Sequence, residues 1–588
     1  MILDSLVILL YFIVVISIGL YKGRGDRSMQ GFAIGDRNIP WWAVLASILA
    51  AEISAGTFLG TPGEGYGLRN FTYVQLAIGT ILARIVVSYV FIKPYYDYRV
   101  VSIYQYLLVR FGVTTRNAAS AVFLITRALA SGTRMYVAAV ILLLGFEMAT
   151  GVKPTPSQEM WIYLGSLILL TAFTAVYTAL GGIKAVVWTD LIQASVMFGA
   201  MGFAIWFLLH QIGGWDKAHE LLTSPAAGPH SLDVFDSGTK SGAGFFANVK
   251  NVLETEYTMW AALLASVFTT MATHGTDQDM VQRMLTAKNP NRSRLALICS
   301  GLADIPINFA FLLIGILLWA FYQIHADPGL PEKNAHVFAY YILHELPIGV
   351  RGLLVAGLFA TAMGSLSTAL NALATSFTED WYRPYIRPGA TQQQELTAAR
   401  WSTVLFAVIL IAIGSVTAWV VVQNPNVRII PIVLGVFGYT YGSLLGVFLT
   451  GMLTRTRGSN RGNVLAMVVG FVAVAFLSGL HNDVWDLAHP RAAAVRIARV
   501  DLAKELKRPP TGDEVATKLQ TTPAEVDRLT RAPAGSAPLF HPEWLPVVEF
   551  PWRIFFGTLV TLGISLCFRT PEAQRRVVEE HLAKQALV

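Results

Sequence analysis

The sequence predicts an all-α polytopic membrane protein with about 13 transmembrane helices and a core of five-plus-five inverted repeats. Of its 588 residues, 54% are hydrophobic and 14% are charged, whereas soluble domains carry about 25% charged residues. Apolar runs of about 20 residues, the length that crosses a bilayer as a helix, recur from one end of the chain to the other. Two of these runs are interrupted by small and polar residues.

Thirteen apolar runs are long enough to span a membrane. They cover residues 3–21, 41–62, 71–93, 119–149, 160–180, 186–211, 258–276, 295–324, 350–378, 398–421, 429–453, 463–480 and 550–568. The first run has neither the basic segment nor the small-residue cleavage site of a signal peptide, so we interpret it as a retained span.

Charge and cysteine usage exclude other classes of protein. The 44 Lys and Arg residues exceed the 37 Asp and Glu residues, giving a net charge of +7. These cations lie in short loops rather than in one patch, which argues against nucleic-acid binding. Cys299 and Cys567 both lie in apolar runs, so we predict no disulfide framework and no CxxC metal or redox motif.

The loop charges predict an orientation, because short cytoplasmic loops carry the Lys and Arg excess. Lys22 and Arg24 follow the first span, whereas Arg69 is the only cation between the second and third spans. Loops after odd-numbered spans are therefore inside, the N-terminus is outside and the C-terminal tail is cytoplasmic. Two long polar segments, 212–257 and 481–549, fall on the outer side.

The segment 481–549 has a helical pattern of its own. Apolar spacing on either side of a Pro-Pro-Thr-Gly sequence predicts two or three short helices. The segment resembles the helical hairpin of bacterial sigma-factor region three, which favours a bacterial inner membrane. Its balanced charge and its outer position oppose DNA binding, and we interpret it as a small solvated cap.

Breaks in membrane helices mark candidate sites, because an interrupted backbone needs protein or a water-filled cavity to satisfy its polar groups. The span 41–62 places small residues around Glu52 and continues into Gly60, Pro62 and Gly63. The span 258–276 also ends in polar residues, and five spans separate the two. Such a pair is typical of an inverted-repeat transporter with a midplane site, and it predicts an ion site at residues 50–57.

Ionisable residues inside spans are costly and are functional by default. Glu52 lies near the middle of the second span and Asp190 at the cytoplasmic start of the sixth, while Arg127 and Arg134 share one face of the fourth. Each of them has an alternative interpretation as a structural ion pair inside the bundle. For Glu52, beside the predicted break, we favour a functional role.

Hydroxyl side chains are concentrated in the span 350–378. In membrane helices such residues often serve close packing. Because four of them lie within two turns, we favour a role as oxygen ligands. The four are Thr361, Ser365, Ser367 and Thr368.

Several motifs resemble one family. The segment 177–198, YTALGGIKAVVWTDLIQASVMF, is similar to the first signature of the sodium:solute symporter family. The segments 275–288 (GTDQDMVQRMLTAK) and 436–451 (VFGYTYGSLLGVFLTG), with the serine-rich span between them, resemble that family in the same order. The resemblance covers about residues 1–470 and the last span.

The resemblance implies a leucine-transporter-type bundle that couples Na⁺ entry to solute uptake by alternating access. The implied main sodium site uses carbonyl oxygens and a hydroxyl, and some members have a second site. The implied ligands are Ala50, Ile53, Thr361 and Ser365 for the main site, and Asp190, Ser367 and Thr368 for the second.

One position departs from the family pattern. Gly364 stands where the family has a second hydroxyl, so the site recruits another ligand, such as the Glu52 carboxylate or water, or binds sodium more weakly. Glu52 matches an aspartate of the proline-transporting branch and an asparagine of the sugar branch. We expect sodium coupling, with proton coupling as the alternative. An alternative role for Asp190 is to cap the loop before the sixth span.

The substrate candidates follow from the same resemblance. Thr57, Thr270 and Thr273 replace residues of the sugar pocket, whereas LGTPGEGYG (59–67) resembles the anion and monocarboxylate branch. Arg134 would pair with a substrate carboxylate. We expect a small organic anion, with a polyol or sugar as the alternative. The candidates for substrate binding or coupling are Glu52, Ser54, Thr57, Thr270, Thr273 and Arg134.

A membrane sensor with a transporter-like bundle and an enzyme remain as less favoured alternatives for the function. The resulting organisation of the chain has seven parts. The parts are 1–40 (peripheral first helix and cytoplasmic loop), 41–211 (first inverted repeat), 212–257 (external loop), 258–454 (second inverted repeat), 455–480 (peripheral helix), 481–549 (external insert) and 550–588 (last helix and cytoplasmic tail). The expected partners are a small-molecule substrate and the lipid bilayer, with no nucleic acid.

Overall fold

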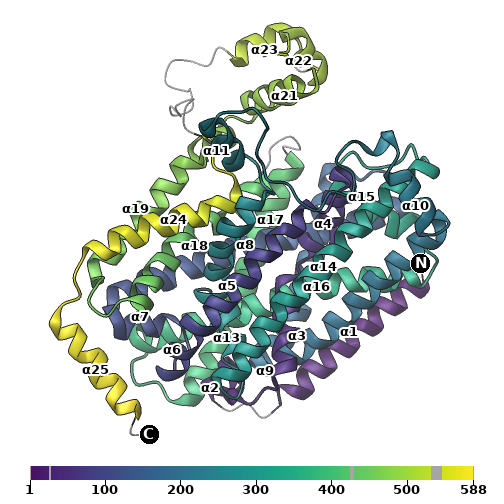
Figure 1. Ribbon diagram of the computed structural model, residues 1–588. Helices are drawn as coiled ribbons and strands as arrows, with labels where there is room; N and C mark the ends of the chain where they lie inside the picture. Colours follow the sequence, from purple (N-terminus) through teal and green to yellow (C-terminus); the bar gives the residue numbers. More distant parts are fainter. Residues whose placement is uncertain (1, 25–27, 424–428, 507, 531–545, 587–588) are drawn as a thin grey trace.

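The architecture comes from a computed structural model, which describes residues 2–24, 28–423, 429–506, 508–530 and 546–586. In these ranges the chain forms helices and loops, without a β-strand beyond two isolated bridges. The helices pack into one bundle, with three short helices projecting beyond one end (Figure 1). The all-α fold class is therefore confirmed.

The first half of the chain supplies helices α1 to α11. They are α1 (Ile2–Lys22), α2 (Met29–Ile34), α3 (Trp41–Glu52), α4 (Ala55–Leu68), α5 (Leu76–Val90), α6 (Ile92–Asp97), α7 (Tyr104–Phe111), α8 (Val113–Thr150), α9 (Pro156–Ile212), α10 (Trp215–Leu222) and α11 (Phe245–Glu254).

The second half supplies the remaining helices. A π-helical turn (Ala261–Ala265) precedes α12 (Ser266–Gly275), and α13 (Gln278–Met284), α14 (Pro290–Ile324), α15 (Asn334–His344) and α16 (Val350–Phe377) follow. A second π-helical segment (Thr378–Ile386) leads to α17 (Gln392–Gln423), α18 (Ile429–Leu453) and α19 (Asn460–Leu477). The chain ends with α20 (Leu480–Ala488), α21 (Pro490–Leu506), α22 (Gly512–Lys518), α23 (Pro523–Thr530), α24 (Phe550–Cys567) and α25 (Glu572–Ala586).

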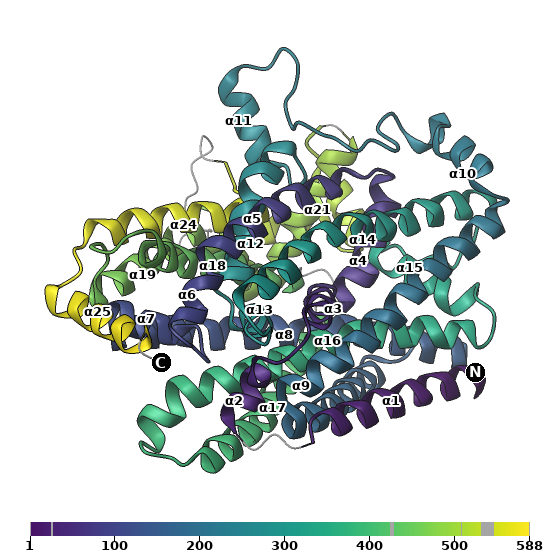
Figure 2. The same cartoon turned by 60° about the horizontal axis from the view of Figure 1, so that its bottom comes forward.

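The predicted break in the second span is present. Helix α3 ends at Glu52, α4 begins at Ala55, and the two helix axes differ by 64°. Ile53 and Ser54 between them have extended backbone, with ψ of 100° and 170°. The second predicted interruption falls at the end of its span: α12 ends at Gly275, and the short helix α13 begins after Thr276 and Asp277. Figure 2 shows α3 and α4 near the middle of the bundle, and Ile53 and Ser54 at the break are buried.

Helix α9 contains the predicted spans 160–180 and 186–211, which meet at a kink at Gly182. Gly182 has a φ of 53°, and a Cβ at this position would lie only 2.6 Å from the carbonyl oxygen of Phe32. A side chain fits neither the conformation nor the space. Helix α9 has 57 residues, far more than one membrane span needs.

By length and composition, the described residues contain nine helices that could cross a membrane, or ten when the bent pair α3 and α4 counts as one. The difference from thirteen has three sources. Helix α9 carries two predicted spans, α12 is shortened by the π-helical turn before it, and the span 429–453 counts only as a shorter apolar helix, Phe437–Leu453. The count of thirteen stays a prediction.

Both long polar segments lie at the same end of the bundle. The backbone N–H of Val548 donates to the carbonyl of Leu477, and that of Glu549 donates to Leu253 in the loop 212–257. Within the insert, α21, α22 and α23 form a small separate core around Val495, Val515 and Val526. The predicted cluster of short helices is therefore present.

Candidate functional site

The break between α3 and α4 supplies free main-chain oxygens. A helix leaves its last four carbonyls without partners inside the helix, and the next helix leaves its first four amides likewise. Here the N–H of Ile53 still donates to Leu49, at 3.1 Å, so the freed carbonyls are those from Ala50 onward. Unwound backbone of this kind suits a hard monovalent cation.

Helix α16 faces this break. It packs against α3, α8 and α9, and its Gly364 is buried so close to α3 that a Cβ there would lie 3.3 Å from the carbonyl oxygen of Ala50. Ser365, the next residue, lines a cavity together with Ser54 and Ala55 of the broken span. The structure thus places Ser365 beside the break, as the predicted main site requires.

The other three hydroxyls of α16 that were predicted as ligands donate to carbonyls of their own helix. Thr361 donates to Leu358 at 2.7 Å, Ser367 to Gly364 at 3.0 Å and Thr368 to Ser365 at 2.8 Å. Their oxygen lone pairs therefore stay available to a cation. Among the described residues, the Ser365 hydroxyl makes no hydrogen bond.

Asp190 of α9 lies beside Gly364 of α16. One of its oxygens, Oδ2, accepts a hydrogen bond from Ser47 of α3 at 2.5 Å. The other, Oδ1, is buried without a partner and lies 3.7 Å from the position of a Cβ on Gly364. The Ala50 carbonyl and the Asp190 carboxylate thus both border the space beside Gly364. Residues predicted for two separate sodium sites meet at this one place.

Glu52 is occupied by other partners. Its Oε1 forms an ion pair with Arg84 of α5 and lies 2.7 Å from Nε2 of His274 on α12. Arg84 also donates to Ser300 of α14 at 2.6 Å. The carboxylate therefore links four helices, and only its buried Oε2 has no partner.

A second charged cluster joins α8 to α13. Arg127 pairs with Asp279 and lies 3.4 Å from Asp277, and Asp277 also accepts a hydrogen bond from the Tyr441 hydroxyl at 2.7 Å. Asp279 also lies 3.2 Å from Arg283. The structural ion-pair interpretation fits Arg127. The partners of Glu52 and Arg127 were not predicted from the sequence. For Arg84, the available signal was a charge within an apolar run.

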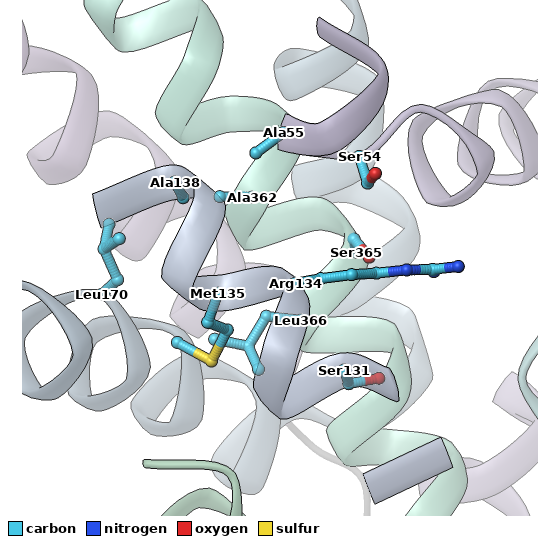
Figure 3. A pocket seen from close by; sticks show the side chains of 10 residues that line it. All are labelled: Ser54, Ala55, Ser131, Arg134, Met135, Ala138, Leu170, Ala362, Ser365 and Leu366. Carbon is cyan, nitrogen blue, oxygen red and sulfur yellow. The ribbon is translucent and has the colours of Figure 1, made fainter. Parts of the chain in front are cut away.

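Arg134 differs from Arg127 in having no partner of opposite charge. Its guanidinium lies 5.0 Å from the centre of the Phe437 ring, and within the described part of the chain it forms neither an ion pair nor a hydrogen bond. Figure 3 shows the Arg134 side chain extending past Ser365 on the side of Ser54 and Ser131, away from Leu170. A half-buried cation beside three hydroxyls can receive a carboxylate.

The cavity that these residues line has a volume of about 10 Å³, which holds about one water molecule. An organic solute therefore needs a more open arrangement of the helices. Of the predicted substrate candidates, the cavity includes Ser54 and Arg134. The lining does not include Glu52, Thr57, Thr270 or Thr273.

A membrane bundle with a broken helix and buried polar groups at the break is typical of a secondary transporter. The sequence model of the sodium:solute symporter family matches residues 32–470. This chain belongs to the sodium:solute symporter family. It is accordingly a multi-pass membrane transporter for a small molecule, and Na⁺ is the coupling ion.

Curated relatives transport different solutes. The sodium-dependent multivitamin transporter of Oryctolagus cuniculus is 27% identical over 82% of this chain and 71% of its own length. The sodium/sialic acid symporter NanT of Aliivibrio fischeri is 24% identical over 80% and 86%, and the sodium-coupled monocarboxylate transporter 1 of Xenopus laevis is 26% identical over 82% and 72%.

A solved structure of a Na⁺-coupled sialic acid symporter matches this chain with a TM-score of 0.71 and 19% identity, and covers 96% of this chain and 97% of that one. It has the leucine-transporter fold. The five-plus-five inverted-repeat core expected from the sequence is therefore the fold of this protein.

Proposed function

We propose that this chain is a Na⁺-driven symporter for a small organic anion, with a monocarboxylate as the preferred class. The observation that carries the proposal is the unpaired Arg134 beside the broken helix. A guanidinium without a counter-ion in a membrane interior is costly. A substrate carboxylate would neutralise it and form two parallel hydrogen bonds with it.

The mechanism follows from population shift between arrangements of the bundle. Na⁺ held by the carbonyls of Ala50, Ile53 and Thr361 and the Ser365 hydroxyl would join α3 to α16 and stabilise the outward-open arrangement. Substrate binding at Arg134 would then favour closure on the outer side. Release of the ion inside would weaken the same contacts and free the substrate.

The experiment is a thermal-shift screen of the purified protein in lipid nanodiscs, in NaCl and in choline chloride. The ligands are short monocarboxylates, their neutral amides, sialic acid, glucose and mannitol. We expect Na⁺-dependent stabilisation by carboxylates and none by the amides. Stabilisation by glucose or mannitol instead would support the alternative, a sugar or polyol symporter, and acid-dependent stabilisation without Na⁺ would support proton coupling.

The Arg134→Ala variant tests the role of the guanidinium. We expect it to abolish carboxylate binding while leaving stabilisation by Na⁺ in place, because the ion contacts other residues. Arg292→Ala, which removes an exposed arginine, is the matched control. Equal loss of neutral and carboxylate ligands in Arg134→Ala would contradict the proposed role in anion recognition.

A further inference from the structure

Three oxygen atoms converge on the place where Gly364 has no side chain. A Cβ on Gly364 would lie 3.1 Å from Oε1 of Gln193, 3.3 Å from the carbonyl oxygen of Ala50 and 3.7 Å from Oδ1 of Asp190. These atoms come from α3 and α9, and Gly364 itself lies on α16. The missing side chain therefore leaves a space bounded by oxygen atoms from two other helices.

The polar atoms around this space are buried without partners. Asp190 is fully buried and Gln193 is 1% exposed. Oδ1 of Asp190 and the two polar side-chain atoms of Gln193, Oε1 and Nε2, make no hydrogen bond in the described chain. Leaving such a buried group unsatisfied is costly, and the cost is higher for a charged group. Two of these atoms, Oδ1 of Asp190 and Oε1 of Gln193, border the space at Gly364, which indicates that a ligand completes the site.

The charges of the groups around this space determine which kind of ligand it can hold. In the described structure Asp190 has no cationic side chain within ion-pair distance, and the hydrogen bonds of Arg283 go to Asp279 and to the Ser47 carbonyl. All of the converging ligand atoms are oxygens, which suit a hard cation. One carboxylate neutralises a monovalent cation, whereas a divalent cation would leave a buried excess charge.

We propose that Ala50, Asp190 and Gln193 form one fused cation site over Gly364, in which the Gln193 amide oxygen replaces a hydroxyl of α16. This inference rests on the proposed sodium symport and deepens it: a single Na⁺, bound by atoms of α3 and α9 in the space left by Gly364 of α16, takes the place of two ions in separate sites. The glycine supplies the room, and Gln193 supplies the oxygen that glycine lacks.

The test is the Na⁺ dependence of both thermal stability and substrate uptake, measured for purified protein in nanodiscs and in proteoliposomes. Gly364→Ala fills the space with a methyl group, and Gln193→Leu removes the amide oxygen. We expect each to raise the half-saturating Na⁺ concentration about tenfold or more, equivalent to about 1.4 kcal/mol. The wild-type protein should show a single saturable Na⁺ response with a Hill coefficient near one.

Two controls separate this role from packing. Gly357→Ala adds a methyl group two turns away on α16, where its nearest neighbours are carbon atoms of Ala200 and Phe58, and it should leave the Na⁺ response unchanged. Gln193 also faces the hydroxyls of Tyr11 and Tyr177. Tyr177→Phe should therefore retain Na⁺ affinity, and a loss equal to that of Gln193→Leu would assign Gln193 to a tyrosine contact and overturn the fused site.

A third variant keeps the inference testable if Gln193→Leu folds poorly. Gly364→Ser by itself returns a hydroxyl to α16, so it should bind Na⁺ more tightly than Gly364→Ala. Unchanged Na⁺ affinity in both Gly364→Ala and Gln193→Leu would overturn the fused site while sodium symport stands. A wild-type protein with no response to Na⁺ would instead refute the proposed symport itself.

Discussion

At the residue scale, the buried polar groups near the helix break divide by whether they have partners. Glu52 and Arg127 are neutralised by Arg84 and Asp279. In the described structure, Arg134 has no counter-ion, and the Ser365 hydroxyl and one oxygen of Asp190 make no hydrogen bond. Buried polar groups are nearly always paired. The unpaired groups are therefore the candidates for contact with ion and substrate, and the paired groups hold the helices in place.

Substitution of Ser365 and Asp190 tests the proposed ion contacts. We expect Ser365→Ala to weaken Na⁺-dependent uptake severalfold, and Asp190→Asn to weaken it about tenfold or more because a full charge is lost. Uptake is measured in proteoliposomes across Na⁺ concentrations. Ser195→Ala, at an exposed position of α9, should behave as wild type. An unchanged Na⁺ dependence in both variants would remove these residues from the ion site.

At the element scale, glycines set how closely the broken span approaches its neighbours. A Cβ on Gly315 of α14 would lie 1.9 Å from the carbonyl oxygen of Pro62 on α4. A Cβ on Gly65 of α4 would lie 2.3 Å from the carbonyl oxygen of Leu312. These contacts hold the half-helix α4 against α14 and so fix the direction of the chain after the break.

Gly315→Ala should destabilise the protein by about 1–3 kcal/mol, because the added methyl group overlaps backbone that must shift. The measurement is the Tm of the purified protein in detergent. Gly199→Ala, where nothing lies within 4 Å of the added carbon, should be neutral or slightly stabilising. Equal Tm values for the two variants would show that α4 and α14 are not packed as described.

The stability of α22 in the insert, residues 481–549, depends on side chains that cap the start of this helix. Thr511 and Glu514 form a capping box at the start of α22, and Arg508 lies 2.5 Å from Glu514. The hydrogen bond from Arg508 and that from the Thr511 backbone lower the pKa of Glu514 to about 2. Because this pKa is below its ordinary value of 4.5, the stabilisation is complete above about pH 4.5 and is lost as the pH falls towards 2.

Glu514→Ala removes both the capping oxygen and the Arg508 pair, so it should speed amide hydrogen exchange in residues 512–518 at pH 7, and its effect should shrink as the pH falls towards 2. Hydrogen exchange of the full-length protein, read by mass spectrometry of peptides from the insert, measures both. The control is Glu525→Ala, because Glu525 forms a similar exposed ion pair with Arg528. A wild-type exchange rate in Glu514→Ala would contradict the capping role.

At the scale of the whole molecule, ion pairs and helix ends join distant parts of the chain. Arg127 of α8 pairs with Asp279 of α13, so a movement of α13 away from α8 must break a buried contact. Asp4 accepts hydrogen bonds from Gly349 and Gly352 at 2.7 and 3.0 Å. The α15 residue Tyr341 donates to Gln211 at 2.5 Å, at the end of α9 that precedes the polar segment 212–257.

We propose that the N-terminus is outside and the C-terminus is cytoplasmic. The contact between Gln574 of α25 and Val109 at the end of α7 supports this orientation, because α7 follows the basic loop after the third predicted span. A periplasmic reporter enzyme fused before Met1 should be active, and one fused after Val588 should be inactive. The same activity at both ends would show that the number of spans is even.

The alternation of apolar runs and basic loops determined the all-α membrane class, and the small residues around Glu52 predicted where the second span breaks. These features are local, because a helix in lipid must satisfy its own backbone and small or polar residues mark where it does not. Gly364 was recognisable from sequence as a missing hydroxyl.

What only the tertiary structure decided is which side chains meet. It paired Glu52 with Arg84, and it placed the Gln193 amide and the Asp190 carboxylate on one side of Gly364. It also left Arg134 without a counter-ion in the described residues. Such contacts join residues far apart in the chain, and they depend on the rotation and crossing of whole helices, which spacing along a single helix does not specify.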